Sequence, residues 1–167
     1  MKKLIIAVAL VLLTGIAFGQ KKIDIEKENE AIKAVIEEER NAWFDGDNDR
    51  VEAAWHQEST SRKIIMSEDG IIEVNGWKEI NTRHRKGMTP ETVEGRKDLD
   101  AQYLNYNIIV YGNTALAYHD CIFSGMWQGQ SVNREQKRIL HLVKIEGEWK
   151  LDMMAHYMIP EAENENE

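Results

Sequence analysis

The chain has 167 residues, with 29 acidic and 21 basic side chains, a formal net charge of −8 and 43% hydrophobic residues. This length and composition suit one globular domain, and the negative charge disfavours binding to nucleic acid or to anionic lipid. Because Cys121 is the only cysteine, an intrachain disulfide is excluded.

Residues 1–19 have the pattern of a secretory signal peptide. Lys2 and Lys3 precede the apolar run LIIAVALVLLTGIAF, and the tripeptide Ala-Phe-Gly at 17–19 has the small residues that a signal peptidase requires. We expect cleavage before Gln20 and a secreted or periplasmic protein that does not contact the membrane after signal cleavage. An uncleaved anchor is the alternative, although the run is short for a bilayer span.

Three helices are predicted in the first half of the mature chain. Apolar residues at helical spacing predict an amphipathic helix from about Asp24 to Phe44 and a shorter one over 48–56. The pair Asn75-Gly76 precedes a third helix.

The turn between the first two helices carries Asp45, Asp47 and Asp49, the spacing with which a calcium loop begins. Such a loop needs glycine at its sixth position and a bidentate glutamate at its twelfth, where this chain has Arg50 and His56. We therefore interpret the turn as a connection in which the intervening glycine ends one helix and Asp47 or Asp49 caps the next. No metal is expected.

Six strands are predicted from short apolar runs separated by turn residues. The first two, KIIM and IIEV, flank the turn at 67–70 and form a hairpin. The polar stretch 86–98 is interpreted as a loop, and the acidic residues 161–167 as a disordered tail. The remaining four strands are predicted at 102–111, 114–127, 134–145 and 149–158.

The segments NAWFDGDNDRVEAAW, NGWKEI, YGNTALAY and KIEGEWKLDMM, in this order, resemble the nuclear transport factor 2-like superfamily, in particular its SnoaL-like secreted bacterial members. The resemblance covers nearly all of the mature chain. It implies one domain over 20–160 with a cone-shaped α+β fold, in which a curved, mostly antiparallel sheet wraps a long helix and leaves a pocket at its open end. The superfamily contains isomerases, cyclases, dehydratases and non-catalytic binding domains, so the fold leaves the function open.

Strand parity predicts which side chains face this pocket. A two-residue turn at 112–113 places Val110, Ile108, Tyr106 and Leu104 opposite Ala115, Ala117, His119 and Cys121. The same rule at 146–147 places Trp149, Leu151, Met153, Ala155 and Tyr157 beside Lys144, Leu142, Leu140, Arg138 and Gln136.

A predicted ligand pocket combines the polar members of these inward sets with two helix tryptophans: Tyr106, His119, Arg138, Tyr157, Trp43 and Trp55. A buried arginine or histidine is costly unless a partner or a ligand satisfies it. In one interpretation, Arg138 holds an anionic or carbonyl group, and His119, oriented by Tyr106, transfers a proton. In the other, His119 bonds a core neighbour and Arg138 pairs with a helix carboxylate such as Glu39.

The opposite face of the sheet carries a second set of polar residues. Parity places Asp120, His141 and Asp152 side by side, where they could bind a transition metal, act as an acid–base pair or form only a surface charge pair. The same face is also apolar enough for a homodimer interface, through Ile122, Val143, Ile145 and Met154.

Two further features bear on catalysis. SnoaL-like sequences often carry pocket-facing histidines on the last strand, but parity here gives the inward positions to Met153 and Ala155 and turns His156 outward. The basic run 83–86 is interpreted as surface at a helix end.

We therefore predict a secreted domain with a hydrophobic cone pocket for a small molecule, dimeric and without a cofactor. The alternative is a cofactor-independent lyase, isomerase or cyclase that acts on a small apolar carbonyl compound with His119 as the acid/base.

Overall fold

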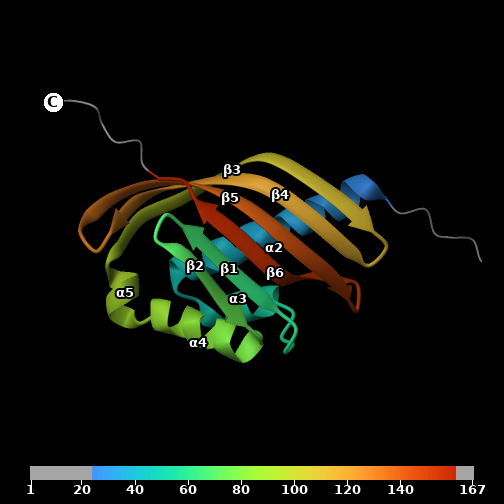
Figure 1. Cartoon of the computed structure of the whole chain (residues 1–167), viewed down its shortest axis with the longest axis horizontal. Coiled ribbons are helices and arrows are strands. Elements are labelled where there is room, and N and C mark those ends of the chain that lie inside the picture. Colours follow the sequence, from blue (N-terminus) through green and yellow to red (C-terminus); the bar gives the residue numbers. More distant parts are fainter. Residues whose placement is uncertain (1–23, 161–167) are drawn as a thin grey trace, which may run out of the picture.

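A curved six-stranded sheet carries a long helix across one face in the computed structural model, which describes residues 24–160 (Figure 1). The predicted signal peptide and acidic tail lie outside these residues. No helix within 24–160 is long and apolar enough to cross a membrane. The helices are α2 (Ile25–Asp45), α3 (Asn48–Ala54), α4 (Trp77–Gly87) and α5 (Pro90–Glu94). The strands are β1 (Arg62–Ser67), β2 (Gly70–Asn75), β3 (Arg96–Tyr111), β4 (Thr114–Trp127), β5 (Gln130–Ile145) and β6 (Glu148–Met158).

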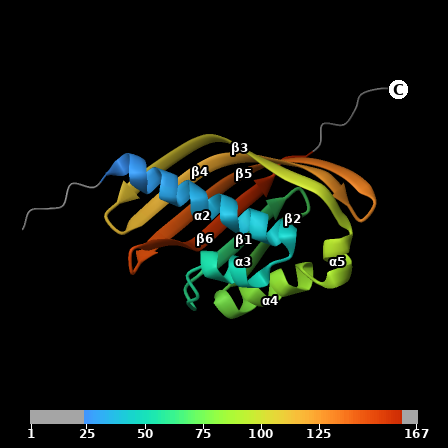
Figure 2. The same ribbon diagram turned by 180° about the vertical axis from the view of Figure 1, so that it is seen from behind.

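The sheet has the strand order β2-β1-β6-β5-β4-β3. Neighbouring strands are antiparallel except β1 and β6, which run parallel and join the N-terminal hairpin to the last strand. Figure 2 shows α2 lying across the sheet, with α3 and α4 on the same side. The expected α+β architecture with a curved, mostly antiparallel sheet is confirmed.

The acidic turn joins and caps two helices. Gly46 ends α2 with a left-handed φ of 73°, and a Cβ there would lie 2.5 Å from Cγ2 of Val93. Asp47 caps α3 by accepting a hydrogen bond from the backbone N–H of Arg50 at 3.1 Å. The capping interpretation is therefore confirmed for Asp47 rather than Asp49. The Arg50 side chain also forms an ion pair with Asp45, at 2.6 Å.

The core lies between α2 and the inner face of the sheet. Ile32 and Ile36 occur one helical turn apart and are fully buried. They pack against the small and branched inward residues of the central strands, Ala115, Ala117, Leu140, Leu142 and Leu151. Because these positions are close to the two tight turns, their predicted parity is confirmed by the register.

The stretch 86–98 is not a loop. It contains the end of α4, the whole of α5 and the start of β3. Thr89 accepts a hydrogen bond from the N–H of Thr92, and Pro90 occupies the first turn of α5. Because α5 has no buried residue, this cap and the proline stabilise the short helix in place of a buried apolar face.

Two β-bulges change the predicted parity farther from the turns. In β3, three steps from Leu104 to Asn107 match two steps in β4, so Tyr103 faces inward and Leu104 is exposed. In β6, Asp152 is the extra residue between the pairs His141–Met153 and Leu142–Leu151. Beyond this bulge every side chain changes face. Met153 and Tyr157 therefore point outward, whereas Met154 and His156 point inward, opposite to the prediction.

Candidate functional site

A cavity of about 430 Å³ lies between the C-terminal half of α2, helix α4 and the inner face of the sheet. Its wall is apolar on one side, where the Trp43 and Trp127 rings lie 5.1 Å apart between centroids. The polar residues of the wall are Glu39, Arg40, Lys63, Arg83, His84, Lys86, Arg134, Gln136 and His156. The cavity is therefore more strongly charged than the apolar cone that the sequence led us to expect.

Buried charged groups meet at the inner end of this cavity. Lys63 Nζ from β1 lies 2.7 Å from Nε2 of His84 on α4. Glu39 from α2 lies 3.5 Å from a guanidinium nitrogen of Arg138 on β5. The parallel pairing of β1 with β6 places Lys63 opposite Met154 and brings His156 to the same wall.

The electrostatics of these groups follow from burial and from their mutual attraction. Burial lowers the pKa of Lys63 to about 8, although Glu39 opposes the change. Burial also lowers the pKa of His84 to about 3 and that of His156 to about 2, and the Lys63 charge adds to both shifts. Burial raises the pKa of Glu39, but the attraction of Lys63 and Arg138 outweighs it and lowers that pKa to about 2. Near neutral pH the site therefore has an ionised carboxylate, two neutral imidazoles and a lysine amine that loses its proton at a lower pH than an exposed lysine does.

Several buried polar atoms around the cavity have no hydrogen-bond partner among the described residues. They are Nε of Arg40, Nε and Nη1 of Arg138, Nδ1 of His84 and Nδ1 of His156. Buried polar atoms normally have a partner, because an unpaired one costs about 1 to 3 kcal/mol. Arg40, His84 and His156 line the cavity, whereas Arg138 lies beside it, so the unsatisfied atoms are concentrated in and next to its wall.

The structure separates the six residues of the predicted pocket. Of these six, only Trp43 lines this cavity. Trp55 is buried in the core, with its ring 5.8 Å from that of His84. Tyr157 lies on the outer face and is 39% exposed, because of the bulge in β6.

His119 and Tyr106 form a separate aromatic cluster between α2 and the inner face of β3 and β4. Their rings lie 4.8 Å apart, and Tyr103 packs beside both. His119 Nδ1 lies 3.0 Å from the carbonyl oxygen of Asp120, and burial lowers the pKa of His119 to about 4. This arrangement matches the interpretation of His119 as a core histidine.

Arg138 is fully buried and pairs with Glu39, as the second interpretation of this residue required. The guanidinium lies behind Met154, which is within hydrogen-bonding distance, and does not line the cavity. The positive charge of Arg138 therefore influences the groups of the cavity without touching a ligand: it holds Glu39 in its ionised form and disfavours a charge on His156.

The predicted row on the outer face is divided. Asp120 pairs with Lys137 at 2.8 Å and lies away from His141. Asp152 lies between two imidazoles, 3.0 Å from His56 and 3.1 Å from His141. Within residues 24–160 no group of three or more metal-ligating side chains has the arrangement of a metal site.

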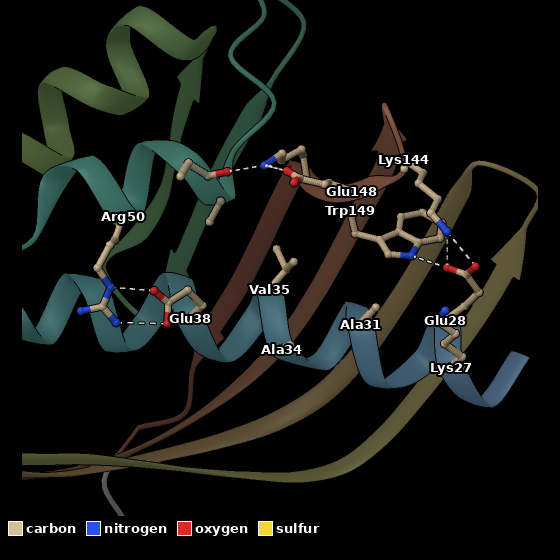
Figure 3. Close-up of a pocket in the computed structure, with 14 residues that line it drawn as sticks. Lys27, Glu28, Ala31, Ala34, Val35, Glu38, Arg50, Lys144, Glu148 and Trp149 are labelled. Atoms are coloured by element: carbon tan, nitrogen blue, oxygen red, sulfur yellow. Dashed lines mark hydrogen bonds and ion pairs between the residues drawn. The ribbon is translucent and has the colours of Figure 1, made fainter.

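A larger hollow, of about 800 Å³, lies between α2, α3 and the turn from β5 to β6 (Figure 3). Its floor consists of small residues of α2 such as Ala31 and Ala34. The charged side chains of its wall other than Lys27 are paired with one another. Glu28, for example, accepts hydrogen bonds from Lys144 and from the indole of Trp149, both at 2.7 Å. Because this chemistry is already satisfied within the protein, we assign the functional site to the smaller, charged cavity.

Sequence reasoning missed three central residues of the cavity. Lys63 belonged to a predicted hairpin strand, His84 to the basic run assigned to the surface, and His156 to the outward parity of β6. His84 is only 2% exposed, so the surface interpretation of that run is wrong for this residue. The available signal was helical spacing, because His84 follows the core residue Ile80 by four positions on α4.

Comparison with solved structures identifies the class of fold. Proteins with the nuclear transport factor 2-like fold, also called cystatin-like, match most of the chain. The expected fold is thereby confirmed. No protein family model matches the sequence, and no curated protein is significantly similar to it.

Three of the similar structures illustrate the relationship. A nuclear transport factor 2-like superfamily protein from Salmonella enterica serovar Typhimurium is 15% identical, with 86% of this chain and 99% of that chain covered and a TM-score of 0.66. A protein of this fold from Novosphingobium aromaticivorans is 12% identical, with 83% and 86% covered and a TM-score of 0.64. A ketosteroid isomerase-like protein from Erwinia carotovora atroseptica is 14% identical, with 79% and 96% covered and a TM-score of 0.59. At these identities the likeness shows the fold alone.

Proposed function

We propose that this protein binds a small organic anion in the cavity between α2, α4 and the sheet. The observation that carries the proposal is the charge of the wall. Five basic side chains surround one carboxylate, Glu39, in a chain whose net charge is −8. These five are Arg40, Lys63, Arg83, Lys86 and Arg134.

Two features of the wall favour a small carboxylate. Arg40 lines the cavity and uses one of the five N–H groups of its guanidinium for a hydrogen bond to Gln136, at 3.3 Å. Guanidinium groups bind carboxylates through such donors. The neighbouring rings of Trp43 and Trp127 offer an apolar surface for the remainder of the ligand, as is usual in small-molecule sites.

Calorimetric titration with lactate and benzoate tests this proposal, with lactamide and benzamide as uncharged controls. We expect the acids to bind and the amides not to bind. Replacing Arg40→Gln should weaken acid binding about tenfold or more, because a hydrogen bond to a charged group is lost. The matched control is Arg85→Gln on α4, since Arg85 pairs with Glu52 and does not line the cavity. If the acids do not bind, or if the two variants weaken binding equally, the proposal is wrong.

We also propose that the protein forms a homodimer through the outer face of the sheet. The apolar side chains of this face include Leu104, Ile109, Tyr111, Tyr118, Ile139, Ile145 and Tyr157. Seven exposed large apolar side chains on one side of a sheet favour burial against a second copy. Met154, one of the four residues predicted for the interface, is buried on the inner side instead, whereas Ile122, Val143 and Ile145 remain on the outer face.

Export from the cytoplasm is the third part of the proposal. It rests on the sequence of residues 1–19, which lie outside the described region. Intact mass of the protein recovered from its native compartment provides the test. A mass that begins at Gln20 would support export with cleavage, and a mass that retains residues 1–19 would indicate an anchor.

A further inference from the structure

Lys63 differs in its surroundings from Lys86, the other lysine in the cavity lining. Its side chain is half-buried and lines the cavity, and its ammonium group contacts the His84 ring at 2.7 Å. Lys86, by contrast, is in the last turn of α4, at the edge of the same cavity. A lysine enclosed in this way is suited to nucleophilic chemistry, because burial disfavours its charged form.

Building on the anion-binding function proposed above, we propose that Lys63 is an amine nucleophile that forms an imine with the carbonyl carbon of a small 2-oxo acid bound in this cavity. Such an acid has a carboxylate and an electrophilic carbon on adjacent atoms. The cavity offers a guanidinium, Arg40, for the first and an amine for the second. A volume of about 430 Å³ accommodates a molecule of this size.

The amine is available near neutral pH. Burial lowers the pKa of Lys63 to about 8, so roughly a tenth of it is unprotonated at pH 7. His84 remains neutral, because burial lowers its pKa to about 3. When Lys63 is protonated, its ammonium group donates a hydrogen bond to Nε2 of the neutral His84 ring. This contact fixes the position of Nζ, so His84 is a positioning residue.

The charged and titratable groups around Lys63 come from four elements. Among the charged groups, Glu39 is the one that stabilises the ammonium form of Lys63, whereas the cations and burial oppose that form. The charged and titratable groups around Lys63 are Glu39 and Arg40 on α2, Arg83 and His84 on α4, Arg138 on β5 and His156 on β6. Because burial and these cations lower the pKa of Lys63 to about 8, the rate of attack by the amine should rise with pH and level off above about 8.

The proposed step needs no oxidant or reductant. The Nζ lone pair attacks the carbonyl carbon while the C=O π pair moves to oxygen, which takes up the proton that the amine loses. The hydroxyl group of this carbinolamine takes up a proton from solvent and leaves as water while the nitrogen lone pair forms the C=N bond. The iminium nitrogen then returns its remaining proton to solvent, which gives the neutral imine. One water is released for each imine formed.

Trapping with sodium cyanoborohydride tests the proposal on the native mature chain. The probes are pyruvate, glyoxylate and 2-oxoglutarate, and peptide mapping locates the reduced adduct. With pyruvate we expect one adduct per chain, with the added mass of pyruvic acid minus one oxygen atom. It should lie on Lys63 and form more than about ten times faster than on any other lysine below pH 8, because an exposed lysine has a pKa near 10.5.

Two variants sharpen the result. Lys63→Arg keeps the positive charge but cannot form an imine, so the selective adduct should disappear. Lys78→Arg removes an exposed lysine of α4 that does not line the cavity and should retain the adduct. The proposal would be overturned if the label were spread over surface lysines, or if none of the three probes labelled Lys63 selectively.

Lactate separates this inference from the proposed function, since it has the carboxylate of pyruvate but no carbonyl carbon to react. If lactate binds and no probe labels Lys63 selectively, the imine is wrong and anion binding stands. If neither lactate nor any probe binds, both are wrong.

Discussion

Glu39 in the C-terminal half of α2 and Arg138 on β5 form an ion pair of 3.5 Å in which both side chains are almost completely buried. The pair links the central helix to the sheet behind the charged cavity. Glu39 also faces Lys63, so a single carboxylate balances two cations, while the only ion pair of Arg138 within the described residues is with Glu39. This asymmetry predicts unequal effects when either partner is removed.

Replacing Glu39→Gln should lower the free energy of unfolding by about 3 to 5 kcal/mol, because the buried Arg138 and the half-buried Lys63 both lose their counter-charge. Arg138→Met should cost less, since Glu39 retains Lys63. Urea denaturation followed by tryptophan fluorescence measures both values. A larger loss in Arg138→Met than in Glu39→Gln would contradict the proposed sharing of Glu39.

The cap of α3 gives a local test of the acidic turn. Asp47→Ala should lower the free energy of unfolding by about 1 kcal/mol, because the hydrogen bond to the N–H of Arg50 is lost. Asp49→Ala is the matched control and should change stability by a few tenths of a kcal/mol, the size of a charge effect in the first turn. Thermal or urea unfolding distinguishes them, and equal losses would contradict the assignment of the cap.

Stability should fall as the pH is lowered from about 6.5 to about 4. Burial lowers the pKa of His84, His119 and His156 below the 6.5 of an exposed histidine. In this window the unfolded chain binds more protons than the folded one, so acid favours unfolding. His119→Phe should reduce the slope by about 1.4 kcal/mol per pH unit. Denaturation curves across the window provide the measurement, and an unchanged slope would place His119 in a polar environment instead.

The proposed dimer interface is tested by adding a charge to each of two exposed isoleucines. Ile139→Glu places the charge in the middle of the outer face of β5, at a side chain that is 38% exposed, and should yield monomers without unfolding. Ile71→Glu makes the same change on the edge strand β2, away from the interface, and should leave the dimer intact. Light scattering reads the mass. A monomeric parent protein, or an Ile139→Glu variant that is still dimeric, would exclude this surface.

The sequence by itself determined the order and type of most elements, because helical and alternating periodicity are local properties. It also determined strand pairing close to the tight turns. Thr114 pairs with Tyr111 and Leu142 with Leu151 as parity required, since a two-residue turn fixes the register of the residues beside it.

The charged cavity was decided by the tertiary structure. One extra residue, Asp152, exchanges the faces of β6 and moves His156 to the inside and Tyr157 to the outside. No local pattern marks such a bulge, because it depends on the partner strand.

The meeting of Lys63 with His84 likewise needs contacts that are distant in sequence. The parallel pairing of β1 with β6 places Lys63 on the inner wall, and the packing of α4 against β1 and β2 places His84 beside it. The chain could specify each residue and its element, but the distance between their nitrogens, and with it the lowered pKa values, exists only after the sheet and helices have packed and excluded water.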